Sequence, residues 1–162
     1  MRETAIETYD MVVLYADPLF KVNSSGEVEQ RHHCFEHKEE YNCLTTAIKQ
    51  TGRFFRIKRM NFSYSNIEKI RAMKPPILHL SIHGHYDDKQ QFKIAIEKEL
   101  TGEEDTLDEK IFARKMKNQI NNINLVIVNS CQSVEISQIL MEFKIPVVIG
   151  VNWSNENMDE DL

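Results

Sequence analysis

Apolar positions along this chain gather in short, nearly uniform runs, which are typical of strands buried on both faces of a sheet. These runs occur at 11–16, 77–82, 125–129 and 147–151. Between them, apolar residues recur every three or four positions, as on the buried face of a helix. The helical patterns occur at 39–51, 66–73, 106–120 and 134–143. Strands that alternate with helices predict an α/β fold, a three-layer sandwich around a mostly parallel central sheet.

The segments between these elements have weaker patterns. Residues 54–62 indicate another strand, while the polar segment 21–38 has no sustained period and predicts a long exposed loop. In 91–97, three apolar residues alternate with other side chains, which predicts a half-exposed strand in a small antiparallel hairpin at the sheet edge. The acidic end of the chain, 154–162, predicts a disordered tail.

Length and composition limit the class of protein. A chain of 162 residues predicts one domain over 1–162. The net charge of -5 argues against nucleic-acid binding, because a nucleic-acid partner requires a basic surface. No apolar run approaches the roughly 18 residues of a membrane span, so no membrane partner is expected. Three cysteines and an N-terminus without an apolar signal segment predict a cytoplasmic protein with free thiols.

Candidate chemistry lies at the ends of two apolar runs, where His83 follows one predicted strand and Cys131 follows another. Residues just beyond the carboxyl ends of neighbouring parallel strands lie close together, at the edge where α/β sheets place their sites. The imidazole could accept the thiol proton, and the helix predicted after Cys131 favours a thiolate. Gly84 lets a substrate carbonyl approach closely, and its amide could stabilise an oxyanion. The alternative is a buried structural cysteine and a histidine that merely ends a strand.

Three segments of the sequence resemble a known family. The first is the apolar strand that ends in His83-Gly84, after which Cys131 follows 48 positions from His83 (131 minus 83). Caspase-like peptidases have a similar separation of about 50 residues. The second segment is 129–133 (NSCQS), and the third is 145–153 (IPVVIGVNW). Together they are similar to the CHAT branch of the caspase-like cysteine peptidases, which is related to the separases.

The resemblance implies a caspase-like fold and a cysteine endopeptidase with a Cys-His dyad. Cys131 would be the nucleophile, His83 its partner in proton transfer, and the amides of Gly84 and Cys131 the oxyanion hole. It also implies protein or peptide substrates, no cofactor, a role in regulated intracellular signalling or defence, and a repeat-containing regulatory partner. Trp153 is expected beside the substrate cleft. Independently of the resemblance, the Asp87-Asp88 pair could line a cleft that favours basic substrate side chains, or could belong to a solvated turn into the hairpin.

Several alternatives stand beside this interpretation. Relatives continue beyond the position of Trp153, whereas this sequence ends at Leu162. A domain shortened at its C-terminus, a fragment of a larger CHAT protein and a catalytically silent interaction module are therefore all considered. Residues 83–88 approximate the metal motif of metallo-β-lactamase-like hydrolases, but no later histidine completes it. A second group, which fits no zinc-finger spacing, consists of His32, His33, Cys34, His37 and Cys43. No metal site is expected.

Overall fold

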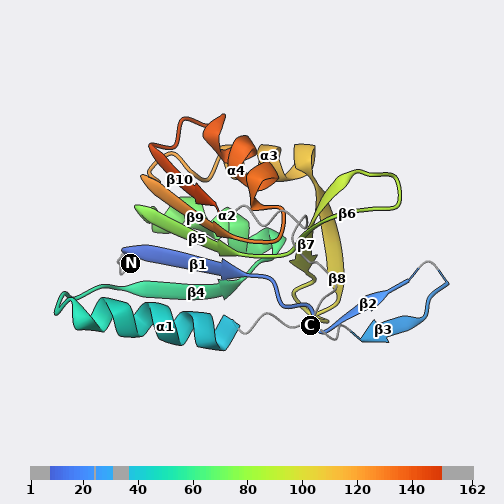
Figure 1. Cartoon of the computed structure of the whole chain (residues 1–162), viewed down its shortest axis with the longest axis horizontal. Helices are drawn as coiled ribbons and strands as arrows, with labels where there is room; N and C mark the ends of the chain where they lie inside the picture. The colour runs from blue at the N-terminus through green and yellow to red at the C-terminus, as the bar shows by residue number, and fades with distance from the viewer. Residues whose placement is uncertain (1–7, 24, 31–36, 151–162) are drawn as a thin grey trace, which may run out of the picture.

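The centre of the structure is a parallel sheet of five strands. The computed structural model describes residues 8–23, 25–30 and 37–150. The strands are β1 (Met11–Tyr15), β4 (Ile57–Asn61), β5 (Ile77–Ser81), β9 (Leu125–Asn129) and β10 (Val147–Gly150). They lie in the order β10-β9-β5-β1-β4 (Figure 1), and each neighbouring pair is parallel. The predicted α/β class and the parallel sheet are therefore confirmed.

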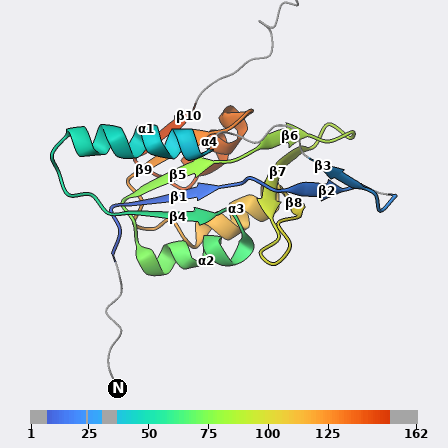
Figure 2. The ribbon, with the colours of Figure 1, turned by 90° about the horizontal axis from the view of Figure 1, so that it is seen from below.

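Helices cover both faces of this sheet. They are α1 (His37–Gln50), α2 (Tyr64–Met73), α3 (Glu109–Lys117) and α4 (Ser133–Met141). Helix α1 lies on one side of the central strands and α2 on the other (Figure 2). Alternate side chains of a strand point to opposite faces, and one set packs with α2, α3 and α4 in the main apolar core. This core includes Val12, Leu14, Leu78, Leu80, Val126 and Val128 from the strands, and Ile67, Ile70, Phe112, Met116, Ile136 and Leu140 from the helices.

Two small antiparallel sheets extend beyond the carboxyl ends of the parallel strands (Figure 1). One is a hairpin of β2 (Phe20–Val22) and β3 (Val28–Gln30). The prediction of a loop throughout 21–38 is therefore wrong. The hairpin turn depends on the side chain of Asn23, whose Oδ1 accepts hydrogen bonds from the backbone amides of Ser25 and Glu27 at 3.0 and 2.9 Å. Side-chain bonding of this kind forms a turn without any apolar period.

The second antiparallel sheet consists of β6 (Gly84–Tyr86), β7 (Phe92–Glu97) and β8 (Glu104–Asp108). The predicted hairpin is present, but β7 is its middle strand. Phe92, Ile94 and Ile96 are buried, and Lys93 and Glu97 are partly exposed, as the alternation predicts. The prediction is wrong at Ala95, which was expected on the exposed side but is buried. The predicted helix at 106–120 also begins later, because 106–108 pair with β7 as the end of β8. The Asp108 carboxylate then caps α3 by accepting from the Ile111 amide at 2.7 Å.

The last strand, β10, is less covered than its sequence predicts. Val147 and Ile149 are each 49% exposed, although the apolar run predicts a strand buried on both faces. Their side chains lie on the face that carries α1, and α1 packs over β1, β4 and β5. Within the described ranges no element lies over β10 on that face. The same ranges contain no helix with the length and apolar character that crossing a membrane requires.

The chain reverses its direction across the sheet at β1. From β1 it passes to β4 on one side, returns to β5 on the other side, and continues outward to β9 and β10. The carboxyl ends of β1 and β5 therefore flank the point where the strand order reverses, which is the usual position of a site in an α/β sheet. The next strand outward is β9, so both strands that precede the candidate residues lie at or beside this point.

Candidate functional site

His83 and Cys131 lie at equivalent positions beyond two neighbouring strands. Ser81 ends β5 and is the register partner of Asn129, which ends β9, an offset of 48 residues (129 minus 81). The same offset places His83 opposite Cys131. The strands remain side by side past their ends, because the Ile82 amide donates to the Asn129 carbonyl at 3.1 Å. Adjacent strands are about 4.8 Å apart, and the backbone of Cys131 lies beside the continuation of β5, where its carbonyl oxygen approaches Gly84. Contact between the His83 imidazole and the Cys131 thiol stays a prediction.

Gly84 lies directly against Cys131. A Cβ atom at Gly84 would be 2.6 Å from the carbonyl oxygen of Cys131 and 3.0 Å from the ring of Phe92. The contact of 2.6 Å with backbone is shorter than a real Cβ atom tolerates, and the contact of 3.0 Å with the Phe92 ring is tight. The reason for glycine here is therefore the close approach of two chain segments.

The amide of Gly84 is also oriented by its strand. The Ala95 amide donates to the His83 carbonyl at 2.9 Å, which makes residues 83 and 95 a hydrogen-bonded pair of the antiparallel ladder. Because such pairs alternate, the next pair, Gly84 with Ile94, is not hydrogen-bonded. The N–H of Gly84 consequently points away from β7.

Gly84→Ala is expected to force β6 away from Cys131 and to lower the free energy of unfolding by about 1 to 3 kcal/mol through overpacking. Urea denaturation measures this loss, and alkylation of Cys131 measures the local displacement. Gly52→Ala is the control, since Gly52 has a positive φ of 67° but no atom within 4 Å of an added Cβ. It should lose stability without changing the reactivity of Cys131. An unchanged alkylation rate of Cys131 in the Gly84 variant would contradict the close approach of the Gly84 and Cys131 backbones.

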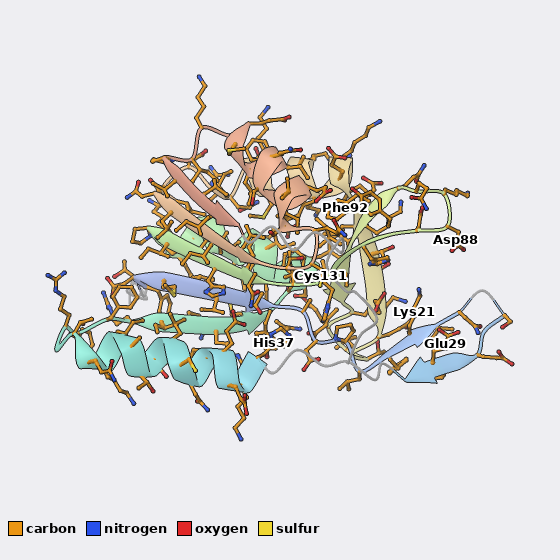
Figure 3. All side chains as sticks on the ribbon, in the orientation of Figure 1. Lys21, Glu29, His37, Asp88, Phe92 and Cys131 are labelled. Carbon is orange, nitrogen blue, oxygen red and sulfur yellow. The ribbon has the colours of Figure 1, made fainter. Side chains whose placement is uncertain are left out.

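The thiol of Cys131 is accessible. Cys131 is exposed and occupies a turn between β9 and α4, and Gln132 has a left-handed conformation with φ 61° before α4 begins at Ser133. The N-terminal end of a helix favours a negative charge. Figure 3 shows Cys131 at the carboxyl ends of the parallel strands. Lys21, Glu29 and Asp88 lie farther out, on the antiparallel segments that extend beyond this end of the sheet.

A contact between β6 and α4 crosses the surface near Cys131. The Tyr86 hydroxyl donates to the Glu135 carboxylate at 2.6 Å, and this hydrogen bond raises the pKa of Tyr86. A hollow of about 440 Å³ lies beside the pair, and its lining includes Phe92, Asp108 and Lys110. The hollow contains side chains of both charges and could receive part of an extended peptide.

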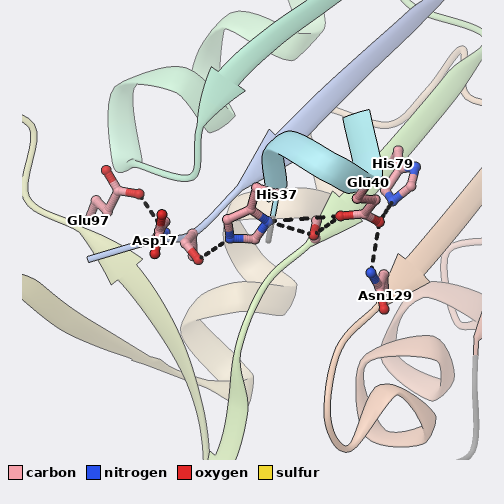
Figure 4. A network of polar contacts seen from close by, with 8 residues as sticks. Asp17, His37, Glu40, His79, Glu97 and Asn129 are labelled. Carbon is pink, nitrogen blue, oxygen red and sulfur yellow. Dashed lines mark hydrogen bonds and ion pairs between the residues drawn. The ribbon is translucent and has the colours of Figure 1, made fainter. Parts of the chain in front are cut away.

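A polar cluster that sequence patterns did not reveal lies under the N-terminal end of α1. Its centre is the carboxylate of Glu40 (Figure 4). Oε1 accepts from His79 Nε2 at 2.9 Å and from Asn129 Nδ2 at 2.7 Å, and Oε2 accepts from Ser81 Oγ at 2.5 Å. His37 is 4% exposed, and its Nδ1 lies 3.0 Å from Ser81 Oγ. We name these five residues the Glu40 cluster.

The electrostatics of this cluster favour an ionised Glu40. Burial opposes the charge and by itself would raise the pKa of the carboxyl. His37, whose Nδ1 lies 3.9 Å from Oε2, and the hydrogen bonds from His79, Ser81 and Asn129 together outweigh burial and hold the pKa of Glu40 well below its usual range. Sequence patterns missed the cluster, but one signal could have found it. His79 and Ser81 are polar residues on a single face of an otherwise apolar strand, where burial requires a partner.

The two predicted substrate-binding residues have different outcomes. The Asp87 carboxylate accepts from the backbone amides of Lys89 and Gln91, both at 2.9 Å, and lies 3.7 Å from Lys93 Nζ. The hydrogen bond from Gln91 contributes most to lowering the pKa of Asp87. This carboxylate shapes its own hairpin, and its contact with substrate stays a prediction. Trp153 and the predicted tail at 154–162 lie outside the described residues.

The metal alternatives are not supported by the described part of the chain. Within it, no three histidine, cysteine, aspartate or glutamate side chains are placed to hold one ion. His37 is buried against the sheet, whereas Cys43 is exposed on α1. The remaining members of that second group, at 32–34, lie outside the described residues.

No protein-family model matches the chain, and no curated protein with which it was compared matches it. The chemistry of the site is therefore inferred from its residues and their geometry.

Proposed function

We propose that this chain is a cysteine endopeptidase of the caspase-like, CHAT type, with Cys131 and His83 as its dyad. The observation that carries the proposal is the pairing of β5 with β9, whose last register partners, Ser81 and Asn129, stand two positions before His83 and Cys131. The exposed thiol and the Gly84 amide that points away from β7 support it. These are the parts that acyl transfer requires: a nucleophile, a base and an oxyanion donor.

The proposed reaction proceeds through a thioester. His83 accepts the thiol proton, and the Cys131 sulfur bonds to the carbonyl carbon of the peptide, whose oxygen becomes an oxyanion. The backbone amides of Gly84 and Cys131 donate hydrogen bonds to this oxyanion. The imidazolium then returns the proton to the leaving amine as the C–N bond breaks. Water that loses its proton to His83 hydrolyses the thioester and frees Cys131.

The proposal includes a cellular setting. The substrate is a protein or peptide in the cytoplasm, and a repeat-containing protein regulates the enzyme. A solvent-accessible thiol would require such regulation, because an unrestrained endopeptidase would damage other proteins. Neither nucleic acid nor a membrane is part of the proposed function, and the reaction uses no cofactor.

A second candidate is a catalytically silent interaction module, or a fragment that a further segment completes. The half-exposed Val147 and Ile149 on the outer strand β10 favour it. Natural proteins commonly protect edge strands with charges or cover them, because a bare edge pairs with other chains. The opposite edge strand, β4, carries Lys58 and Arg59, whereas β10 carries no charge.

Alkylation separates the two candidates. Iodoacetamide at pH 6 is expected to modify Cys131 at least about 10-fold faster than Cys43, because a thiolate is the reactive form and His83 promotes it. Peptide mass spectrometry measures both rates in one sample, and Cys43 is a suitable reference since it is also exposed. His83→Ala should remove the difference. Equal rates in the unmodified protein would favour the silent module.

A further inference from the structure

The carboxylate of Glu40 joins three elements of the fold. It extends from α1 and accepts hydrogen bonds from Ser81 on β5 and from Asn129 on β9, at 2.5 and 2.7 Å. It also accepts a third hydrogen bond, from His79 Nε2 at 2.9 Å, which is a second bond to β5. One side chain of the helix therefore links the two strands that precede the dyad. Ser81 is 1% exposed and His79 is 7% exposed, so these bonds are sheltered from water.

The linked side chains stand immediately before the dyad. Ser81 is two positions before His83, and Asn129 is two positions before Cys131. Ser81 and Asn129 are also the last residues of their strands and are direct register partners. Glu40 therefore holds the two strand ends together at the last pair of residues before the strands give way to His83 and Cys131.

His37 extends the cluster to His83 itself. The His37 Nε2 lies 3.0 Å from the carbonyl oxygen of Ala16, which follows β1, and its Nδ1 contacts Ser81. A carbonyl oxygen only accepts, so Nε2 is the donor in this bond. With both nitrogens engaged, the His37 ring is fixed, and the ring of His83 stands edge-on to it at 6.4 Å between centroids and 74° between planes.

We propose that Glu40 is the positioning residue of the dyad, acting directly on the two strand ends and, through Ser81 and His37, on the imidazole of His83. This inference rests on the proposed function. Glu40 acts through the geometry of the cluster rather than through contact with substrate, since its carboxylate is bonded to the strands that precede the dyad. Small displacements of reacting groups reduce rates steeply, so loosening this clamp should slow the chemistry of Cys131.

The chemistry of the cluster requires a carboxylate. His79 Nε2, Asn129 Nδ2 and Ser81 Oγ all donate, and an ionised carboxylate only accepts, with room for all three. Glutamine has the same shape but replaces one acceptor oxygen by an NH₂ group, which would face donors. Glu40→Gln therefore removes part of the clamp without leaving a cavity.

The test measures the alkylation rate of Cys131 between pH 6 and pH 9 in the unmodified protein, Glu40→Gln and Glu142→Gln. Glu142 is exposed at the end of α4 and is not a member of the Glu40 cluster, so its variant has the same change in charge. We expect Glu40→Gln to lower the rate at pH 6 by at least about 10-fold, with the rates converging within about twofold at pH 9, where a thiol ionises without assistance. The rate of Cys131 in Glu142→Gln and the rate of the reference Cys43 should not change.

Each outcome decides between the inferences. If Cys131 of the unmodified protein is alkylated faster than Cys43 and Glu40→Gln does not change its rate, the positioning role is overturned and the proposed function stands. If Cys131 of the unmodified protein is alkylated no faster than Cys43 at pH 6, both the positioning role and the proposed function are overturned. A rate lowered equally at every pH, together with a faster Cys43, would indicate general unfolding and would also overturn the positioning role. If Glu40→Gln does not fold, Ser81→Ala removes one of the three bonds, and a reduction of about threefold at pH 6 is the expected result.

Discussion

Cys131→Ala is expected to reduce peptide hydrolysis by roughly 10⁴-fold or more, because among the described residues Cys131 is the cysteine at the strand ends, and the proposed thioester forms on its sulfur. The same change should alter the free energy of unfolding by no more than about 0.5 kcal/mol, since Cys131 is exposed. This combination, lost activity with retained stability, distinguishes a nucleophile from a cysteine that supports the fold.

The experiment uses a library of fluorogenic peptides with both acidic and basic side chains before the cleaved bond, so that no substrate preference is assumed. Cys43→Ala is the matched control, because it removes an exposed thiol from α1 at a distance from the strand ends. Thermal denaturation of each variant accompanies the assay. Hydrolysis by Cys131→Ala at the rate of the control would exclude the proposed mechanism.

Glu40→Ala is expected to lower the free energy of unfolding at pH 7 by about 2 to 3 kcal/mol, which corresponds to a fall in Tm of roughly 5 to 10 °C. The change leaves three sheltered donors without their acceptor, on His79, Ser81 and Asn129. The estimate lies below the range for a fully buried charge because the Glu40 side chain is 27% exposed.

The size of this effect should depend on pH. The pKa of Glu40 in the folded protein lies well below the ordinary value of 4.5, which applies to the unfolded chain. Its contribution is therefore complete above about pH 5 and declines as the pH falls below 4.5 toward the folded pKa. The stability of the unmodified protein and that of Glu40→Ala should consequently converge in acid.

Urea denaturation at about pH 7 and about pH 3.5 measures this convergence, with Glu142→Ala, at the exposed end of α4, as the control. The control should remain within about 0.5 kcal/mol of the unmodified protein at pH 7. A difference between Glu40→Ala and the unmodified protein that is the same at both pH values would show that packing, and not the charge, accounts for the loss.

Much of the site followed from the sequence because it depends on neighbouring strand ends. The apolar runs before His83 and Cys131 predicted buried parallel strands, and β5 and β9 are indeed neighbours in register. Gly84 was predicted as a point of close approach for a substrate carbonyl, and in the structure the backbone of Cys131 itself approaches it. A strand and the residue that ends it are local features of the chain, so the run of apolar residues and the residue type that follows it are enough to predict them.

Other features required the folded chain. Uniform apolarity predicted that β10 is buried on both faces, but burial depends on which element lies above a strand, and Val147 and Ile149 are half-exposed. The β2–β3 hairpin was missed because the Asn23 side chain, and no apolar period, forms its turn. The sequence names the residues that take part in such features, but it does not show which segments pack against them in the folded chain.

By itself, the sequence determined the α/β class, the parallel strands and the positions of His83 and Cys131 just beyond two of them, because the spacing of apolar residues specifies which segments are buried strands. Only the tertiary structure decided that Glu40 of α1 joins β5 to β9. The carboxylate and its partner Asn129 are 89 positions apart, and no periodic pattern links a helical carboxylate to donors on two different strands. Such a contact exists only once α1 packs on the sheet, where burial makes every donor require an acceptor.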